Sequence, residues 1–170
     1  MVETRRVLKK GKFVITRKGK FVLTLSNKIV KSIKPYCRKI QIVGSIRRME
    51  KNPVDIDIAL IPKDKENKIK IEENLRKKGK FVQGGEKRET FKIEGVKVEI
   101  YYTTEDSWGA TLLAYSSKFG AGIGLRIVAR KKGFKLNQYG LFKRNKKVAG
   151  KTEEEIYHAL EREWKKPELR

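Results

Sequence analysis

The sequence has one cysteine, Cys37, and one histidine, His158, among its 170 residues. A lone cysteine excludes a disulfide framework and a cysteine zinc site, and a lone histidine excludes a histidine-rich metal site. No run of 18 apolar residues is present, so no membrane-spanning helix is predicted. The N-terminus also lacks the apolar stretch of a signal peptide. These absences favour an intracellular protein with no membrane partner.

Acidic residues are few compared with basic ones. The chain has 20 Asp and Glu against 43 Lys and Arg, which gives a net charge of +23. Such an excess favours association with a polyanion and does not determine the fold. Nucleic acid is the first choice of partner. An anionic membrane is the weaker choice, because no basic helix has a broad apolar face.

The first hundred residues mix strand and helix patterns. Two β-rich runs around Lys18-Gly19 predict a hairpin over residues 12–25, and helical spacing then predicts a helix over 26–37. Further on, the patterns predict a strand at 39–45, an alternating strand at 54–62 and a helix within 65–80 that ends at Gly79. A pair of strands within 81–104 is predicted to turn at Glu94-Gly95.

The pattern changes after Asp106, and the best boundary between two lobes lies near residues 104–107. Residues 107–134 predict two helices with a break near 116–124, and a short hairpin-like segment follows. Thr152 and Glu155 have the spacing of a capping box, which predicts a final helix.

Three carboxylates stand in strand patterns. Asp55 and Asp57 are two residues apart, so they share one face of a strand. Adjacent carboxylates repel each other, and bound divalent cations relieve that repulsion, Mg²⁺ being favoured because it takes oxygen ligands. Glu99 lies in a second alternating strand that could neighbour the first and complete a site for two metal ions. The alternative is an edge strand with a solvated polar face.

Upstream of the aspartates, Gly44-Ser45 follows a strand and begins a predicted helix. Glycine lets a phosphate approach the backbone, and a helix N-terminus offers N–H groups to it. Arg47 and Arg48 add donors that match phosphate oxygens. The pattern therefore predicts a phosphate site followed by a metal site.

These stretches resemble a known family. GSIRR…VDIDIALIP (44–48, 54–62) is similar to the nucleotidyltransferase signature of family X DNA polymerases, the family of DNA polymerase beta. The segment 25–48 resembles the helix and strand that lead into that signature. KKGFKLNQYGLF (131–142) resembles a motif of the nucleotide-selecting subdomain, and 154–170 resembles the C-terminal end of bacterial and viral members.

The resemblance implies an α+β fold with two parts. Residues 1–105 would form a nucleotidyltransferase palm, with a mixed or antiparallel sheet, helices and the N-terminal hairpin. Residues 106–170 would form a small C-terminal α+β nucleotide-selecting subdomain. The family's reaction is template-directed addition of deoxynucleotides to a primer 3′-hydroxyl, and short-gap filling in DNA repair is the expected role. The expected partners are gapped or primer-template DNA and deoxynucleoside triphosphates. The protein is expected to be a monomer in the cytoplasm or associated with the nucleoid, and a viral origin stays open.

The resemblance also assigns residues. Asp55, Asp57 and Glu99 would be catalytic and would bind two Mg²⁺ ions, for which Mn²⁺ can substitute. The nucleotide-binding residues would be Gly44, Ser45, Arg48, Tyr115 and Ser116. Among DNA-binding residues, the resemblance assigns Arg126 to the template side of the minor groove. The other candidates for DNA contact follow from basic charge and interleaved polar and aromatic residues, and are Arg130, Lys131, Lys132, Asn137, Tyr139 and Lys143. A solvated surface for the basic residues and core packing for Tyr139 stay open as alternatives.

The sequence departs from the family in three places. Glu99 stands where the family usually has Asp, and its extra methylene puts activity or metal position in doubt. AYSSK (114–118) stands where the family has its sugar-contacting turn, and FGAGIG (119–124) replaces polar residues near the incoming base. Two other interpretations stay open: a nucleotidyltransferase that acts on other acceptors, such as RNA or DNA ends, and a degenerate, non-catalytic DNA-binding module.

Overall fold

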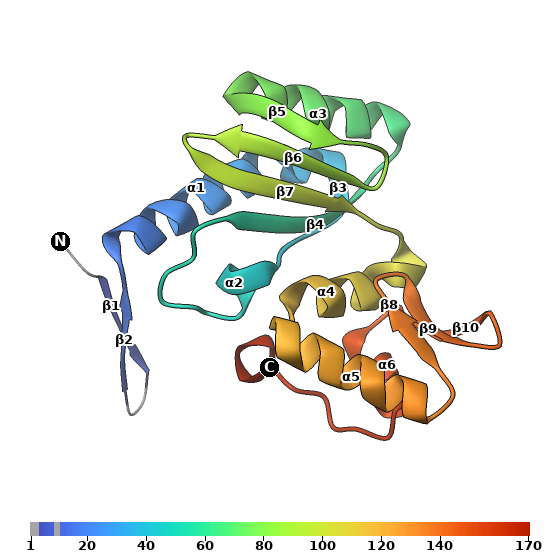
Figure 1. Ribbon diagram of the computed structural model, residues 1–170. Coiled ribbons are helices and arrows are strands. Elements are labelled where there is room, and N and C mark those ends of the chain that lie inside the picture. Colours follow the sequence, from blue (N-terminus) through green and yellow to red (C-terminus); the bar gives the residue numbers. More distant parts are fainter. Residues whose placement is uncertain (1–3, 9–10) are drawn as a thin grey trace. The chain divides into compact units, whose positions relative to one another are not determined.

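The computed structural model describes residues 4–8 and 11–170, whose contacts divide the chain into two units, residues 1–102 and 103–170 (Figure 1). The first unit contains a five-stranded sheet and a two-stranded ribbon, the second contains a three-stranded sheet, and each unit has its own hydrophobic core. Helices and a mixed sheet are both present, so the predicted α+β class is confirmed. Within the described ranges, no helix is long and apolar enough to cross a membrane.

A five-stranded sheet forms the centre of the first unit. Its strands lie in the order β3 (Cys37–Ile42), β4 (Ile56–Pro62), β7 (Val96–Tyr102), β6 (Arg88–Ile93) and β5 (Gly79–Gly84). β4 and β7 are parallel, and the other neighbours are antiparallel. The predicted strand 54–62 is therefore an inner strand of the sheet, with a long crossover between it and β7.

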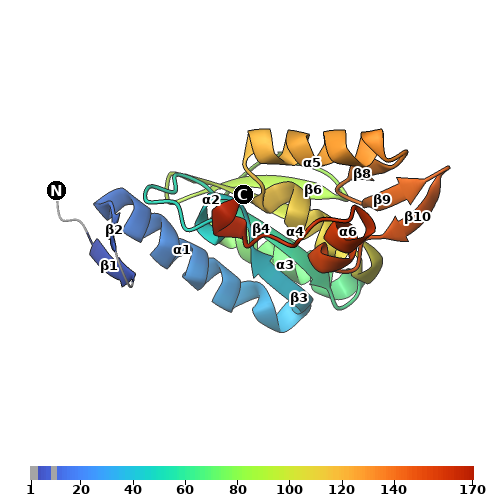
Figure 2. The same ribbon diagram turned by 90° about the horizontal axis from the view of Figure 1, so that it is seen from below.

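Two helices, α1 (Arg17–Ile33) and α3 (Lys65–Lys78), cover one face of this sheet (Figures 1 and 2). Side chains alternate between the two faces of a strand, so Ile56 and Ile58 of β4 pack into the core under the helices together with Val98 of β7. Asp57 and Glu99 lie between these positions and so belong to the opposite face. We call that opposite face, the one that α1 and α3 do not cover, the open face.

The predicted hairpin at 12–25 is wrong. Its Lys18-Gly19 turn lies in the first turn of α1, where the Thr16 side chain accepts a hydrogen bond of 3.0 Å from the Gly19 backbone N–H. Val22, Leu25 and Ile29 follow at helical spacing and are buried. The helix predicted at 26–37 therefore begins nine residues earlier, and it also ends earlier, at Ile33, because a short 3₁₀ turn with Pro35 follows and Cys37 begins β3. The hairpin lies upstream as β1 (Thr4–Leu8) and β2 (Gly11–Ile15).

The other elements of the first unit are close to their predictions. α3 ends at Lys78, before Gly79, and the turn at Glu94-Gly95 joins β6 to β7 with positive φ at both residues. The Gly44-Ser45 helix is α2 (Gly44–Arg47), a single turn. The pair of strands predicted within 81–104 is incomplete, because β5 precedes β6 as a third strand.

The second unit packs helices against a three-stranded sheet. Its elements are α4 (Trp108–Ser116), α5 (Phe119–Lys131), β8 (Lys135–Asn137), β9 (Gly140–Lys143), β10 (Lys146–Ala149) and α6 (Glu153–Ala159). The predicted break between two helices falls at Ser117-Lys118. The capping box of Thr152 and Glu155 is confirmed at the start of α6. Leu113, Leu141 and Ile156 join α4, β9 and α6 in one core.

Candidate active site

The three predicted carboxylates come together on the open face. Asp57 of β4 lies directly opposite Glu99 of β7 in the parallel register, and Asp55 immediately precedes β4. The Tyr101 hydroxyl lies 3.1 Å from Asp57 Oδ1 and 3.3 Å from Glu99 Oε2. The Tyr101 hydroxyl therefore lies within hydrogen-bonding distance of two carboxylates that belong to different strands.

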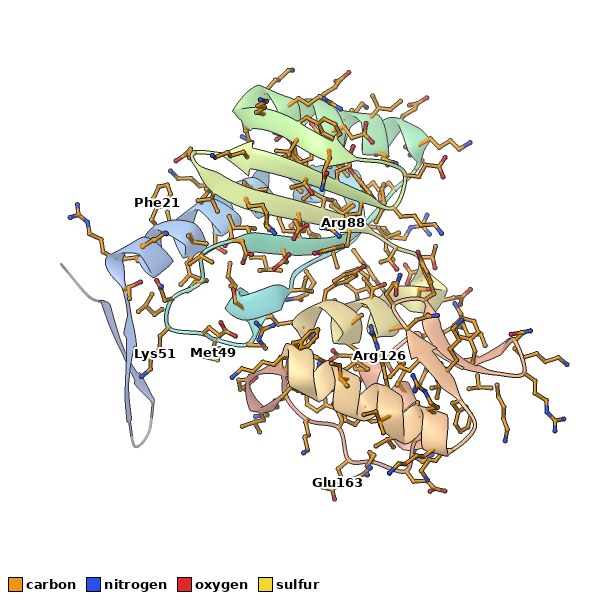
Figure 3. All side chains as sticks on the ribbon, viewed as in Figure 1. Phe21, Met49, Lys51, Arg88, Arg126 and Glu163 are labelled. Carbon is orange, nitrogen blue, oxygen red and sulfur yellow. The ribbon has the colours of Figure 1, made fainter. Side chains whose placement is uncertain are left out.

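Two basic side chains contact Glu99. Lys97 Nζ lies 3.0 Å from Glu99 Oε2 and 3.9 Å from Asp55 Oδ2. Arg88, on β6, forms an ion pair with the other oxygen of Glu99, and Figure 3 labels this arginine on the sheet. Glu99 is buried, with 6% of its surface exposed, so these pairs compensate a charge that is largely removed from water.

The two paired carboxylates have opposite pKa shifts. Burial raises the pKa of Asp57 to about 6, and the charge of Asp55 adds to the increase. Burial also acts to raise the pKa of Glu99, but the hydrogen bonds from Lys97 and Arg88 outweigh it and lower that pKa. Glu99 is thus held as an anion, whereas Asp57 is costly to ionise unless a cation arrives.

The carboxylates of Asp55, Asp57 and Glu99 are suitable ligands for a divalent cation, but they are not arranged around a common point. Three carboxylates supply the oxygen ligands that Mg²⁺ prefers. Among the residues that the structure describes, however, no group of three His, Cys, Asp or Glu side chains is arranged to hold an ion. Lys97 and Arg88 contact the two carboxylate oxygens of Glu99, which are the oxygens that a metal would need.

Gly44 and Ser45 lie beside Asp57. The Val43 backbone N–H donates to the Asp57 carbonyl at 2.8 Å, which brings the start of α2 against β4. Gly44 has φ +64°, and a Cβ there would collide with the Asp57 carboxylate. Ser45 Oγ is buried and finds no hydrogen-bond partner among the described residues. A buried hydroxyl without a partner is a polar group that a ligand can satisfy.

Arg48, the third residue predicted at this turn, is paired. Its Nε and Nη2 donate to Glu50 Oε1 at 2.9 and 2.8 Å. Glu50 is itself tied back to α2, since its backbone N–H donates to the Ser45 carbonyl at 3.0 Å. An anionic ligand at this turn would compete with Glu50 for the guanidinium.

Tyr115 and Ser116, also predicted to bind nucleotide, lie in the second unit at the C-terminal end of α4. Tyr115 is half-buried, and Ser116 is fully buried, with none of its surface exposed. The Ser116 hydroxyl is therefore turned into the protein in this structure.

The predicted DNA-binding residues all lie in the second unit. Arg126 (labelled in Figure 3), Arg130 and Lys131 are on α5 and at least partly accessible to solvent. Lys132 pairs with Glu161, and the Asn137 side chain accepts a hydrogen bond of 2.9 Å from the Tyr139 backbone N–H. Asn137 thus stabilises the β8–β9 turn.

A basic hollow with a volume of about 540 Å³ also lies in this unit. Its lining residues are Arg130, Gly133, Phe134, Lys135, Asn137, Phe142, Arg144 and Asn145. Lys143 lies beside it, with its ammonium group 5.3 Å from the centre of the Phe134 ring. Cations around aromatic rings, without an acidic lining residue, suit a nucleic-acid strand.

Sequence reasoning missed three residues of the candidate site. Lys97 and Tyr101 are two positions before and after Glu99, so strand alternation alone could have found them on the same face. Arg88 belongs to β6, and the tight turn predicted at Glu94-Gly95 sets the register that pairs it with Tyr101, so the hairpin pattern could have placed it beside Glu99.

Comparisons with known proteins agree on one family. Residues 123–170 match the family model of the DNA polymerase beta thumb. The repair DNA polymerase X of the Pig/Kenya isolate of African swine fever virus is 30% identical over 147 residues, 81% of this chain and 84% of the viral protein. The same-named protein of the Tick/Malawi isolate is 31% identical over 137 residues, 75% of this chain and 79% of the viral one.

Proposed function

Because the chain belongs to family X of DNA polymerases, we propose that it is a repair polymerase that extends a primer 3′-hydroxyl with deoxynucleotides, directed by a template strand. The observation that carries the proposal is the pairing of Asp57 with Glu99 across β4 and β7, next to Asp55. We infer that it fills short gaps in DNA repair, because the viral relatives are named repair polymerases. We also propose that it acts inside the cell as a monomer.

We infer the following roles for the carboxylates. Asp55 and Asp57 would hold both metal ions, and Glu99 would hold the ion next to the primer. Two Mg²⁺ ions, or Mn²⁺ in their place, would supply charge that acidifies the attacking hydroxyl and stabilises the leaving pyrophosphate. The raised pKa of Asp57 supports this assignment, because a carboxylate that is costly to ionise alone gains most from a nearby cation.

The triphosphate would lie at the start of α2. Gly44 leaves the space for its close approach, Ser45 Oγ would donate to a phosphate oxygen, and Arg48 would exchange Glu50 for the triphosphate. Tyr115 and Ser116 would face the sugar after a local rearrangement of the end of α4, since Ser116 is buried here.

The second unit would bind the DNA. Arg126 would contact the template side of the minor groove, as in the family. The residues proposed to contact the DNA backbone and sugars are Arg130, Lys131, Lys132, Asn137, Tyr139 and Lys143. Several of them line or flank the basic hollow, which supports this assignment.

A non-catalytic DNA-binding protein is the second candidate. One observation favours it: Lys97 and Arg88 hold Glu99, and no group of three metal-binding side chains is ready among the described residues. Such a protein would keep its basic surface and would need no divalent cation.

Extension of a gapped duplex with each of the four nucleotides, in Mg²⁺ and in Mn²⁺, separates the candidates. We expect incorporation of the templated nucleotide by the intact chain and its loss in Asp57→Asn, with DNA binding retained. Glu73→Gln, on α3 and away from the open face, is the matched control and should leave incorporation unchanged. Absence of incorporation in both metals would favour the non-catalytic candidate, and untemplated addition would favour a terminal transferase.

A further inference from the structure

Lys97 lies between two of the carboxylates proposed to bind metal. Its Nζ is 3.0 Å from Glu99 Oε2 and 3.9 Å from Asp55 Oδ2. Lys97 and Glu99 are two positions apart on β7, so both side chains belong to the open face. A single ammonium group therefore contacts carboxylates that come from opposite sides of the β4–β7 pairing.

This position is the one that a shared cation would need. An ion that bridges the loop before β4 to Glu99 must be coordinated by oxygens from both, and the ammonium group already contacts both. Arg88 takes the second oxygen of Glu99 from the side of β6. With both of its oxygens paired to basic side chains, Glu99 can bind a metal only where at least one of these contacts opens.

The side chain of Lys97 can leave this position. It is 52% exposed, whereas that of Glu99 is 8% exposed, so the lysine is on the solvent side of the pair. A lysine has a flexible four-carbon stem and a strongly hydrated ammonium group, so moving it into water costs little. The backbone of Glu99, by contrast, is held on both sides by the pairing of β7 with β4 and β6, and its side chain is buried.

We propose that Lys97 is an internal counter-cation: it holds Asp55 and Glu99 together in the metal-free protein and is displaced when divalent ions bind. The inference rests on the proposed function, since it requires Asp55, Asp57 and Glu99 to be metal ligands. Lys97 is then a positioning residue that competes with the metal. It stabilises the metal-free sheet and sets the cation concentration at which the site fills.

The test measures Mn²⁺ binding by the full chain without DNA or nucleotide, from the electron paramagnetic resonance signal of free Mn²⁺. Lys97→Met removes the competitor, so we expect its affinity for Mn²⁺ to rise between about three- and tenfold, the range of a half-exposed ion pair. In chelator, the same variant should melt at a lower temperature than the parent protein, because Asp55 and Glu99 lose a shared partner.

Three further proteins control the experiment. Lys97→Arg keeps the cation and should bind Mn²⁺ like the parent chain. Lys92→Met removes one charge from the same face at the position paired with Lys97, and its affinity should change less than about twofold. Asp57→Asn should lose Mn²⁺ binding at the carboxylates, so any Mn²⁺ that it still binds reports on sites elsewhere on the protein.

The outcomes are distinct. Tighter binding by Lys97→Met alone supports the inference. Unchanged or weaker binding would overturn it, weaker binding meaning that Lys97 helps Glu99 to hold the ion. If the parent chain and Asp57→Asn bind the same amount of Mn²⁺, no ion binds at the proposed metal site. The proposed site then fails, and the inference fails with it.

Discussion

At the scale of single residues, Asp57 makes the folded protein sensitive to pH. Its pKa of about 6 lies above the ordinary value of 3.8, so the folded state binds more protons than the unfolded state between these values. The contribution of this group to the free energy of unfolding therefore falls as pH rises from about 4 to about 6, and it stays low above that range.

Asp57→Asn should consequently stabilise the metal-free protein while it abolishes catalysis. At pH 7 in chelator we expect its melting temperature to exceed that of the parent chain by roughly 3 °C, the shift that ~1 kcal/mol gives in a chain of this size. At pH 4 the difference should shrink, since the parent carboxyl is then largely protonated. Differential scanning calorimetry at both pH values checks this, and an equal difference at both would contradict the pKa assignment.

Alternation along strands predicted the acidic residues of the site but left their basic partners unrecognised. Asp55, Asp57 and Glu99 could be placed on strand faces from the sequence, because period two is a local property. The contact of Glu99 with Arg88 depends on the register of the β6–β7 hairpin, which the Glu94-Gly95 turn sets locally, so the sequence held this signal as well. The parallel pairing of β4 with β7, by contrast, joins strands distant in sequence, and local patterns could not give its register.

At the scale of elements, the turn from β3 into α2 requires glycine at position 44 for two reasons. Its φ is +64°, and a Cβ would collide with the Asp57 carboxylate. For Gly44→Ala we expect the free energy of unfolding to fall by ~2 kcal/mol or more, from backbone strain plus the collision. Urea denaturation measures this loss, and the displacement of Asp57 should abolish nucleotide incorporation.

Gly95→Ala separates those two causes. Gly95 has φ +79°, but a Cβ there would meet nothing within 4 Å, so this variant carries the backbone strain alone. It should lose roughly 1 kcal/mol of unfolding free energy and keep its activity. Equal losses for the two variants would mean that the contact between Gly44 and Asp57 contributes nothing.

The end of the second unit depends on a buried ion pair. Arg170 Nη1 lies 2.8 Å from Glu153 Oε1, and their side chains are 1% and 4% exposed. The same guanidinium donates from Nε to the Lys165 carbonyl at 2.8 Å. Arg170→Ala leaves the Glu153 carboxylate buried without this cation, so we expect a loss of ~3 kcal/mol in urea denaturation.

The double variant Arg170→Met with Glu153→Gln controls that measurement. It removes both charges and should recover much of the loss, because an unpaired buried charge costs more than a missing pair. If the double variant were as unstable as Arg170→Ala, the loss would come from packing against Tyr157 and Trp164 instead.

The hairpin predicted at 12–25 was wrong because a local turn pattern was read where a helix begins. Lys18-Gly19 between β-rich runs is typical of a turn, yet Thr16 caps a helix there and the buried face of that helix continues to Ile33. A Cβ on Gly19 would lie 3.0 Å from Pro53 Cδ, and this close approach is a tertiary reason for glycine. Tertiary packing thus required the glycine that local reasoning assigned to a turn.

At the scale of the whole molecule, the charge of +23 makes binding to DNA depend on salt. Each phosphate neutralised releases counterions, so a protein with about six to ten contacts loses roughly 10³- to 10⁵-fold in affinity between about 50 and 200 mM salt. We expect a loss in this range for a gapped duplex, measured by fluorescence anisotropy. A variant with Arg130, Lys135 and Arg144 all changed to Ala should lower the log–log slope by roughly 3.

The matched control for that slope is a triple alanine variant of lysines on the exposed surface of the first unit, Lys70, Lys77 and Lys78 of α3. It removes the same amount of positive charge from α3. This helix covers one face of the sheet, and the carboxylates lie on the other. Its slope should stay within about one unit of the parent value. An equal decrease in both variants would show that total charge, and not the basic hollow, governs binding.

The parallel pairing of β4 with β7 also decides when the site can form during synthesis. Residues 63–95, with α3, β5 and β6, separate the two strands, and this whole crossover must fold back before Glu99 meets Asp57. On the ribosome, Asp55 and Asp57 emerge before β7, the strand with which β4 pairs. A nascent chain would therefore assemble the proposed cation and nucleotide site late, once residues through Tyr102 have left the exit tunnel.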